Sequence, residues 1–178
     1  MRNNFNAFEI SPVPPPGPGA IAPELYRGIY GMPMFATLPT SDLKASTEFW
    51  TEVLGFFDLF TIPGQLTHLR RWAFQDVLLV PGATQPHIPI SSFSFACLAQ
   101  EIEAIADRCR AFDSACTTGT RSTPWNTIEL EIITPENARI IFTAARELDP
   151  AGEEATYLRD AGFDVPEASP AASQNTEG

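Results

Sequence analysis

Apolar and polar positions between residues 34 and 80 follow a pattern that predicts one helix and four strands. Residues 34–38 form a short apolar run typical of a strand. Ser41 can cap a helix, and apolar side chains then recur on one helical face until Gly55, which ends it. Three strand-like runs follow at 56–62, 66–74 and 77–80, separated by a Pro63-Gly64 turn and a polar Gln75-Asp76 turn.

The same order of elements returns in the second half of the chain. Phe35 and Phe93 open the first strand of each half 58 residues apart, and Leu54 and Phe112 close the two helices at the same spacing. The pattern therefore predicts an α+β fold of two tandem βαβββ modules. The second module is expected to hold a strand at 92–98, a helix at 101–112, and strands at 116–120, 127–133 and 139–143.

Both ends of the chain lie outside this repeat. Six prolines fall within the first 23 residues, and such density excludes a helix and removes the donors that a sheet needs. The last 32 residues hold eight acids against one arginine and end in a small, polar stretch. We therefore expect an extended arm at 1–30, a folded unit at 31–146 with modules at 31–82 and 90–146, and a largely disordered acidic tail at 147–178 after one short helix near 153–160.

Charge and composition narrow the classes of function. The net charge of −11 repels nucleic acid and anionic lipid, so we expect neither a nucleic-acid nor a membrane partner. No apolar run approaches the length of a membrane-spanning helix, and the N-terminal residues lack a secretory signal pattern, which predicts a cytoplasmic protein. Cys97, Cys109 and Cys116 have no metal-site spacing and are expected to be buried, inert thiols.

Two segments carry a family resemblance. The stretch 38–56, LPTSDLKASTEFWTEVLGF, resembles the opening of the vicinal oxygen chelate superfamily, which includes glyoxalase I, extradiol dioxygenases, and fosfomycin- and bleomycin-resistance proteins. The segment 134–138, TPENA, stands where that superfamily commonly has Asp-Pro-Asp-Gly-Asn, with Thr134 in place of the Asp and Asn137 in place of the Gly. The resemblance implies a half-barrel around a cavity, usually with a metal held by His and Glu side chains from the strands.

The positions at which this superfamily places metal ligands hold hydrocarbon side chains here: Phe35, Leu79, Phe93 and Ile141. A shift of one residue along any of these strands brings in no imidazole or carboxylate, and divalent metals need such nitrogen or oxygen ligands. His87 lies in the proline-rich linker, and His68 alone cannot form a metal site. We therefore expect no metal and no cofactor.

Without a metal, the resemblance points to the drug-binding branch, in which aromatic side chains stack on a flat ligand. Phe35, Trp72, Phe93 and Phe95 fall at strand positions, where the alternative for each is a place in the core. Trp50 is assigned to the core because it shares a helical face with apolar residues. Trp125 follows Pro124 in a polar loop and is the strongest candidate for ligand contact, because the corresponding region borders the groove in the bleomycin-resistance proteins.

Strand alternation adds three polar candidates. His68 shares a strand face with Arg70 and Trp72, where it either lines the cavity or pairs at a strand edge or dimer contact. Glu129 and Glu131 alternate with apolar residues, so both carboxylates face the cavity if the apolar face packs on the helices. In that position they favour a cationic ligand, and a salt bridge from Glu131 to Arg70 or Arg71 is the alternative.

The resemblance, with hydrocarbon side chains at the ligand positions, implies a metal-free protein that holds a small aromatic natural product or antibiotic and keeps it from its target. The resemblance to the bleomycin-resistance branch also implies a homodimer, with grooves between two chains. One alternative is an enzyme of the same superfamily, such as a lyase, dioxygenase or tailoring enzyme. Such an enzyme would have a displaced metal site, or would use acid–base chemistry by Glu129, Glu131 or His68. Another alternative is an interaction module whose proline-rich arm docks on a partner. The predicted ligand-binding residues are Phe35, His68, Arg70, Trp72, Phe93, Phe95, Trp125, Glu129, Glu131 and Ile141, with no catalytic residue and no metal ligand.

Overall fold

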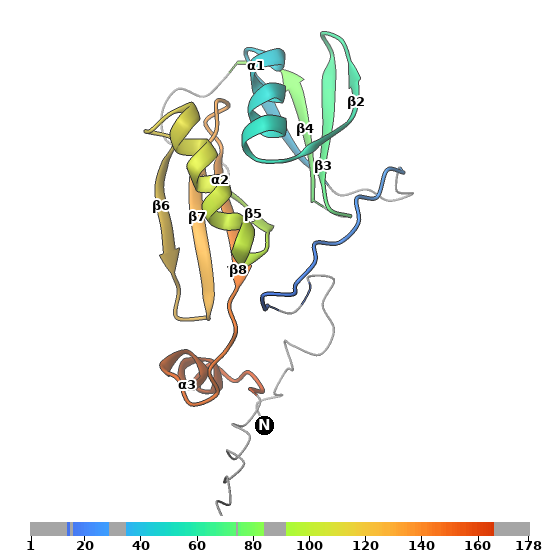
Figure 1. The fold of residues 1–178 in the computed structure, drawn as a ribbon. Coiled ribbons are helices and arrows are strands. Elements are labelled where there is room, and N and C mark those ends of the chain that lie inside the picture. Colours follow the sequence, from blue (N-terminus) through green and yellow to red (C-terminus); the bar gives the residue numbers. More distant parts are fainter. Residues whose placement is uncertain (1–13, 15, 29–34, 74, 84–91, 166–178) are drawn as a thin grey trace, which may run out of the picture.

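The computed structural model describes residues 14, 16–28, 35–73, 75–83 and 92–165, which form two four-stranded sheets (Figure 1). In each sheet the first strand pairs in parallel with the last, and the remaining pairs are antiparallel. Each sheet therefore comes from one βαβββ module, which confirms the predicted α+β fold. The first sheet has the order β1 (Ala36–Thr40), β4 (Gln75–Pro81), β3 (Leu66–Arg71), β2 (Phe57–Ile62), and the second has the order β5 (Ser92–Ala96), β8 (Arg139–Ala145), β7 (Thr127–Ile133), β6 (Thr117–Ser122).

One helix follows the first strand of each module. The first is α1 (Leu43–Glu48), which continues as a π-helical turn, η1 (Phe49–Val53). The second is α2 (Ala99–Phe112), and a third helix, α3 (Glu153–Asp160), follows the second sheet at the position expected from the sequence. None of the helices in the described ranges is long and apolar enough to cross a membrane.

Three local predictions from the sequence are wrong. Asp42, rather than Ser41, caps α1, because its side chain accepts a hydrogen bond from the Ala45 amide at 3.0 Å. The strand β3 ends at Arg71, and Trp72 lies in the following turn with a φ of 55°. The polar pair Gln75-Asp76 begins β4 instead of forming a turn, because each of the two side chains finds hydrogen-bond partners on other elements.

The two modules share one hydrophobic core. Alternate residues of both sheets point toward the helices and into this core, among them Leu69 and Leu130, which are fully buried. Trp50 is also fully buried, as predicted, and meets the rings of Phe56 and Phe95 edge-on. The helix-covered side of each sheet therefore faces the other module, and the opposite side of each sheet, here called its outer face, points away from the shared core.

Polar contacts also join the modules at the core boundary. Trp50 Nε1 donates to Glu136 Oε2 at 3.1 Å, and Arg108 donates to the Val53 carbonyl at 2.8 Å. Glu136 belongs to the segment 134–138 that carried the family resemblance, and its carboxylate is buried beside Trp50 of the first module. These bonds fix the modules relative to each other.

The arm packs on this unit where the structure describes it, whereas the segment after β8 packs mainly on itself. In the arm, the Ala20 carbonyl accepts a hydrogen bond from Gln100 at 2.8 Å, and two carbonyls near residue 28 accept from Arg70. The segment after β8 forms a small apolar cluster of its own around Leu158 of α3. Residues 1–13, 15, 29–34 and 166–178, which include Pro12, Pro15 and the end of the acidic tail, lie outside the described residues.

Candidate ligand-binding site

A cavity of about 420 Å³ lies where β1 and β4 of the first sheet approach β5 of the second. We call it the inter-sheet cleft. Three of the predicted site residues, Phe35, Phe93 and Phe95, meet in its wall, although they come from the two different modules. The full lining is Phe35, Ala36, Gln75, Asp76, Ser92, Phe93, Ser94 and Phe95.

The three phenylalanines of the cleft differ in how far their rings are exposed. Phe95 is only 7% exposed and packs its ring against Phe56 and Phe142, so it forms a floor that is held by the core. Phe93 is half-buried and also packs against the core. Phe35 is 39% exposed, so its ring is the one available to stack on a ligand.

A buried cluster of charged side chains stands behind the cleft on the outer face of the first sheet. Arg70 donates from Nε to Asp76 Oδ1 at 2.7 Å and from Nη2 to Asp76 Oδ2 at 2.6 Å. His68 Nε2 lies 3.0 Å from the same Oδ2, and the rings of Phe35 and Phe60 flank the imidazole at 5.6 and 5.2 Å. The cluster therefore satisfies its own charges, and Asp76 is the member that reaches the cleft wall.

Trp72 and Arg71 belong to the module junction and not to the cleft. Trp72 is 8% exposed, and its ring lies 4.8 Å from the Arg71 guanidinium. Arg71 donates to the Ala96 carbonyl and to Glu101 across the junction. The sequence predicted that Trp72 shares the strand face of His68. This is wrong, because β3 ends at Arg71, one residue before Trp72.

Burial changes the acid–base properties of groups at this junction. Desolvation lowers the pKa of Arg71, although Glu101 opposes the change. Burial also raises the pKa of Cys97 to about 12 and that of Cys109 to about 12, and it raises the pKa of Cys116. The three cysteines are buried thiols, in agreement with the sequence prediction.

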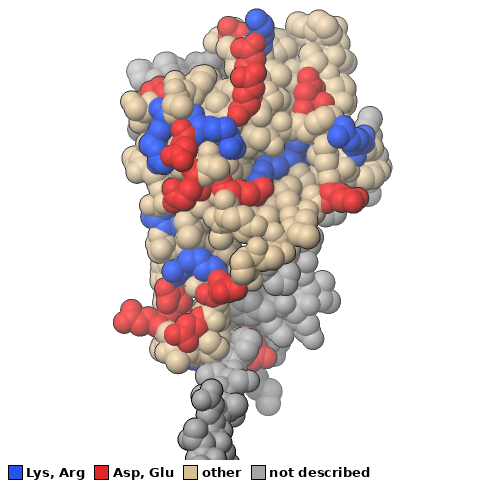
Figure 2. Space-filling view, viewed as in Figure 1, with Lys and Arg blue, Asp and Glu red and all other residues tan. Residues whose placement is uncertain are grey.

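Glu129 and Glu131 lie on the outer face of the second sheet, on the side opposite the helices. Both are ion-paired, Glu129 with Arg121 at 2.6 Å and Glu131 with Arg139 at 2.5 Å. The hydrogen bond from Arg139 lowers the pKa of Glu131. Neither glutamate lines the inter-sheet cleft, and the alternative pairing of Glu131 with Arg70 or Arg71 is wrong, because Glu131 pairs with Arg139 of the neighbouring strand β8. Figure 2 views this module from its helix-covered side, where acidic and basic side chains also adjoin one another.

The structure places Ile141 next to the cleft and Trp125 far from it. Ile141 is half-buried and is paired with Ser94, which lines the cleft. Trp125 is 46% exposed in the turn between β6 and β7. That turn is at the opposite end of the second sheet from Ser92, so the structure does not bring Trp125 to the cleft.

The residues at the expected metal positions do not fit a metal ion. Leu79 is fully buried in the core, and the outer-face residues beside it on β4 are Leu78 and Val80. The two potential ligands on this face, His68 and Asp76, are bound to each other, and the Arg70 guanidinium beside them repels a cation. Within the described ranges, no three His, Cys, Asp or Glu side chains are grouped closely enough to hold a metal.

Sequence reasoning missed Asp76 as a site residue. The signal was present, because in residues 76–80 Asp76 alternates with the core residues Val77 and Leu79 and so shares a face with Leu78. The polar Gln75-Asp76 pair instead predicted a turn. Ser92, Ser94 and Gln75 were also missed, because their place depends on how the two sheets meet.

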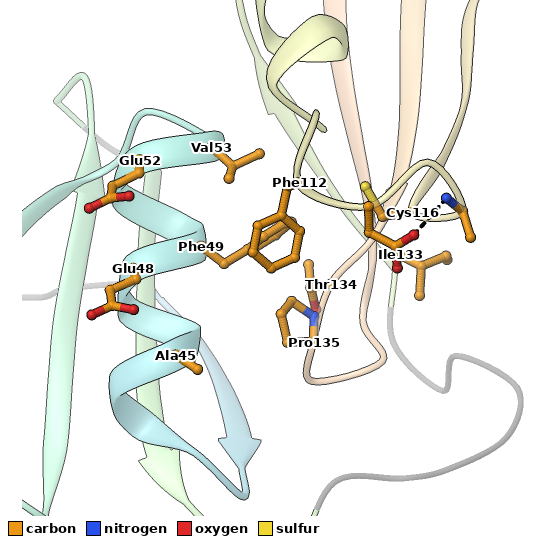
Figure 3. A pocket seen from close by; sticks show the side chains of 12 residues that line it. Ala45, Glu48, Phe49, Glu52, Val53, Phe112, Cys116, Ile133, Thr134 and Pro135 are labelled. Carbon is orange, nitrogen blue, oxygen red and sulfur yellow. Dashed lines mark hydrogen bonds between the residues drawn. The ribbon is translucent and has the colours of Figure 1, made fainter. Parts of the chain in front are cut away.

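A second and larger cavity, of about 500 Å³, lies on the helix side of the molecule between η1 and the end of α2 (Figure 3). The rings of Phe49 and Phe112 meet there at 4.9 Å, and Figure 3 shows Glu48 and Glu52 pointing away from them. None of the predicted site residues lines this cavity. The inter-sheet cleft, although smaller, is therefore the candidate ligand-binding site.

Comparison with known proteins supports the fold and leaves the ligand open. No family model matches the sequence, and no curated protein does. A glyoxalase/bleomycin resistance protein/dioxygenase from Nocardioides is similar in structure, with a TM-score of 0.52 and 20% identity over 70% of this chain and 90% of that one. The fosfomycin resistance protein FosX from Listeria monocytogenes, in complex with Mn(II) and sulfate, gives a TM-score of 0.56 and 15% identity over 75% and 99%.

A bleomycin resistance determinant encoded on the transposon Tn5 has a TM-score of 0.51 and 15% identity over 65% of this chain and 98% of its own. The fold of this protein is therefore that of the glyoxalase, bleomycin-resistance and fosfomycin-resistance proteins, the fold of the vicinal oxygen chelate superfamily. At this level of identity the likeness establishes the fold alone.

Proposed function

We propose that this protein is a metal-free binding protein that sequesters a planar aromatic compound, such as a natural product or antibiotic, in the inter-sheet cleft. The observation that supports this most directly is the lining of the cleft, with three phenylalanines, two serines and one carboxylate that Arg70 already neutralises. Small-molecule sites are typically apolar and aromatic with a few placed polar groups. Two of the similar structures are named as resistance proteins, for fosfomycin and for bleomycin, which supports an antibiotic as the ligand.

The proposal is tested by calorimetric titration with a panel of planar aromatic antibiotics. We expect one member to bind, and Phe35→Ala to weaken that binding roughly twofold to tenfold, since a stacked aromatic pair contributes about 0.5–1.5 kcal/mol. Tyr157→Ala is the matched control, because Tyr157 is an exposed aromatic residue on α3, away from the cleft. Absence of binding across the panel would contradict the proposal. Stoichiometric iron, zinc, nickel or manganese in the purified protein would contradict its metal-free part.

One observation favours a second candidate function, an enzyme that uses acid–base chemistry without a metal. His68 is held by Asp76 on the outer face of the first sheet, and a carboxylate that orients an imidazole is a common arrangement for a general base. Mass spectrometry of the ligand after incubation separates the two functions. A binding protein returns the ligand unchanged, whereas an enzyme returns a product, and His68→Gln then abolishes its formation.

We also propose that two chains pair through their outer sheet faces. The outer face of the first sheet exposes Phe60 and Ile62, at 38% and 40%. Contiguous exposed apolar side chains of this kind mark surfaces that another molecule covers. Light scattering should give twice the chain mass of 19.5 kDa. Phe60→Asp should shift that value toward the monomer, and a monomer mass for the unaltered protein would refute the pairing.

A further inference from the structure

The N-terminal arm ends its described course on the outer face of the first sheet. Figure 1 shows it, in blue, running from beside the second module to the first. The carbonyl oxygens of Tyr26 and Gly28 both accept hydrogen bonds from Arg70 Nη1, at 2.7 and 2.6 Å. The Tyr26 ring lies 5.5 Å from the same guanidinium. Two backbone oxygens of the protein itself thus converge on one buried cationic group.

The guanidinium lies in line with the cleft. In the strand register Arg70 pairs with Asp76 on one side and with Phe57 on the other. Asp76 lines the cleft, and Phe57 is covered by Arg27 of the arm, whose guanidinium lies 4.4 Å from the ring. The row Asp76, Arg70 and Phe57 therefore runs across the sheet from the cleft, at Asp76, to the arm, at Phe57.

The arm is held in a way that allows it to leave. Among the described arm residues 16–28, none is buried, so the arm itself contributes no side chain to the core. Its hydrogen bonds to Arg70 and Gln100 are made through backbone carbonyls and not through interlocking side chains. If the arm is released, Arg70 Nη1 loses its hydrogen bonds to the two arm carbonyls, and oxygen atoms of a ligand could replace them.

We propose that the carbonyl oxygens of the turn 26–28 occupy an oxyanion-binding subsite on Arg70, and that an acidic group of the ligand displaces them. The inference rests on the proposed function and adds the ligand class, an aromatic compound with a carboxylate, sulfonate or phosphate group. Asp76 binds Nε and Nη2 and so fixes the guanidinium, while Nη1 presents two N–H groups to paired oxygens. Arginine binds oxyanions through such converging donors, and charged acceptors make stronger hydrogen bonds than carbonyls.

Glycine at position 28 gives a point variant that disturbs the occupant in the full chain. A Cβ on residue 28 would lie 2.5 Å from Tyr26 Oη and 2.6 Å from its Cζ, so Gly28→Val forces the Tyr26 ring out of its place beside the Arg70 guanidinium. Gly19→Val is the matched control in the same arm, because nothing lies within 4 Å of its Cβ position. Unchanged unfolding transitions would show that both variants keep the fold.

Two fluorescent dyes serve as probes, anilinonaphthalene sulfonate and its neutral analogue phenylnaphthylamine. We expect Gly28→Val to strengthen binding of the sulfonate about tenfold, with the neutral dye unchanged, and Gly19→Val to change neither. Adding Arg70→Lys to Gly28→Val should remove the gain, because lysine lacks the forked donors. Equal strengthening of both dyes, or no change in either, would overturn the inference.

The two proposals can fail separately. Binding of the neutral dye and its loss in Phe35→Ala report on the aromatic cleft, whereas the ratio of sulfonate to neutral affinity reports on the arm and Arg70. A cleft that does not bind the neutral dye contradicts the proposed function, and the difference in sulfonate affinity between Gly28→Val and Gly19→Val still decides whether the arm covers an oxyanion subsite.

Discussion

Asp76 is the residue on which the polar part of the cleft depends. It is 4% exposed and binds both Arg70, which is fully buried, and His68. A buried ion pair adds little net stability, but removing one partner leaves an uncompensated charge. The cluster is therefore costly to break, even though forming it stabilises the fold only modestly.

We expect Asp76→Ala to lower the free energy of unfolding by about 3–5 kcal/mol, because the Arg70 guanidinium then stays buried without a carboxylate. Urea-induced unfolding measures the change. The control is Asp107→Ala, since Asp107 pairs with Arg110 but is 75% exposed, and a surface pair of this kind contributes under about 1 kcal/mol. Equal losses in the two variants would show that the cluster is hydrated in solution.

At the scale of single elements, the outer face of the second sheet is held by pairs between neighbouring strands. Glu131 of β7 accepts from Arg139 of β8, and Glu129 of β7 accepts from Arg121 of β6. Both arginines therefore bind carboxylates on the central strand. Each glutamate is therefore neutralised by an arginine of the same chain.

The pair Glu131–Arg139 makes stability depend on pH in a defined direction. Arg139 lowers the folded-state pKa of Glu131, so the pair contributes stability above the unfolded-state pKa and loses it as pH falls through the folded value. We expect Glu131→Gln to be less stable than the unaltered protein at neutral pH, by a small margin because both side chains are about one third exposed. Urea unfolding at a series of pH values should show the difference vanish in acid and shrink in high salt. A difference that grows in acid would contradict this sign.

The sequence predicted well the elements in which the order of apolar and polar residues simply follows which side chains are buried. The strand Thr127–Ile133 alternates polar and apolar residues as far as Ile132, and the structure has the predicted bounds. The start of β4 was missed, because Gln75 and Asp76 are polar and only contacts with Ala96 and Arg70 make them tolerable in a strand. Such contacts between distant residues leave no local signal in the sequence.

The candidate site was only partly predictable for the same reason. Phe35, Phe93 and Phe95 were identified as aromatic residues at strand positions, and the structure joins them in one cleft. Trp125 was chosen for its polar loop, but the position of that loop depends on which end of the sheet it closes. The contact of the arm with Arg70 spans more than 40 residues and follows no periodicity.

For the whole molecule, the important feature is that the repeat does not produce two independent domains. Residues of both modules form one buried cluster, and Trp50 and Glu136 join them with a hydrogen bond. The cluster around Leu158 of α3 is separate from it. The two modules are therefore expected to unfold together, and α3 is expected to detach without them.

We expect calorimetry to show one main transition whose calorimetric and van't Hoff enthalpies agree, because neither module can open without exposing the shared core. Leu69 and Leu130 are fully buried, one in each sheet, so Leu69→Ala and Leu130→Ala should each lower that same transition, at a cost of about 2–5 kcal/mol. Leu158→Ala should leave it nearly unchanged, since Leu158 lies in the separate cluster. Two resolved transitions, with Leu69→Ala moving only one of them, would mean that the modules are independent and that the inter-sheet cleft is a contact between two domains.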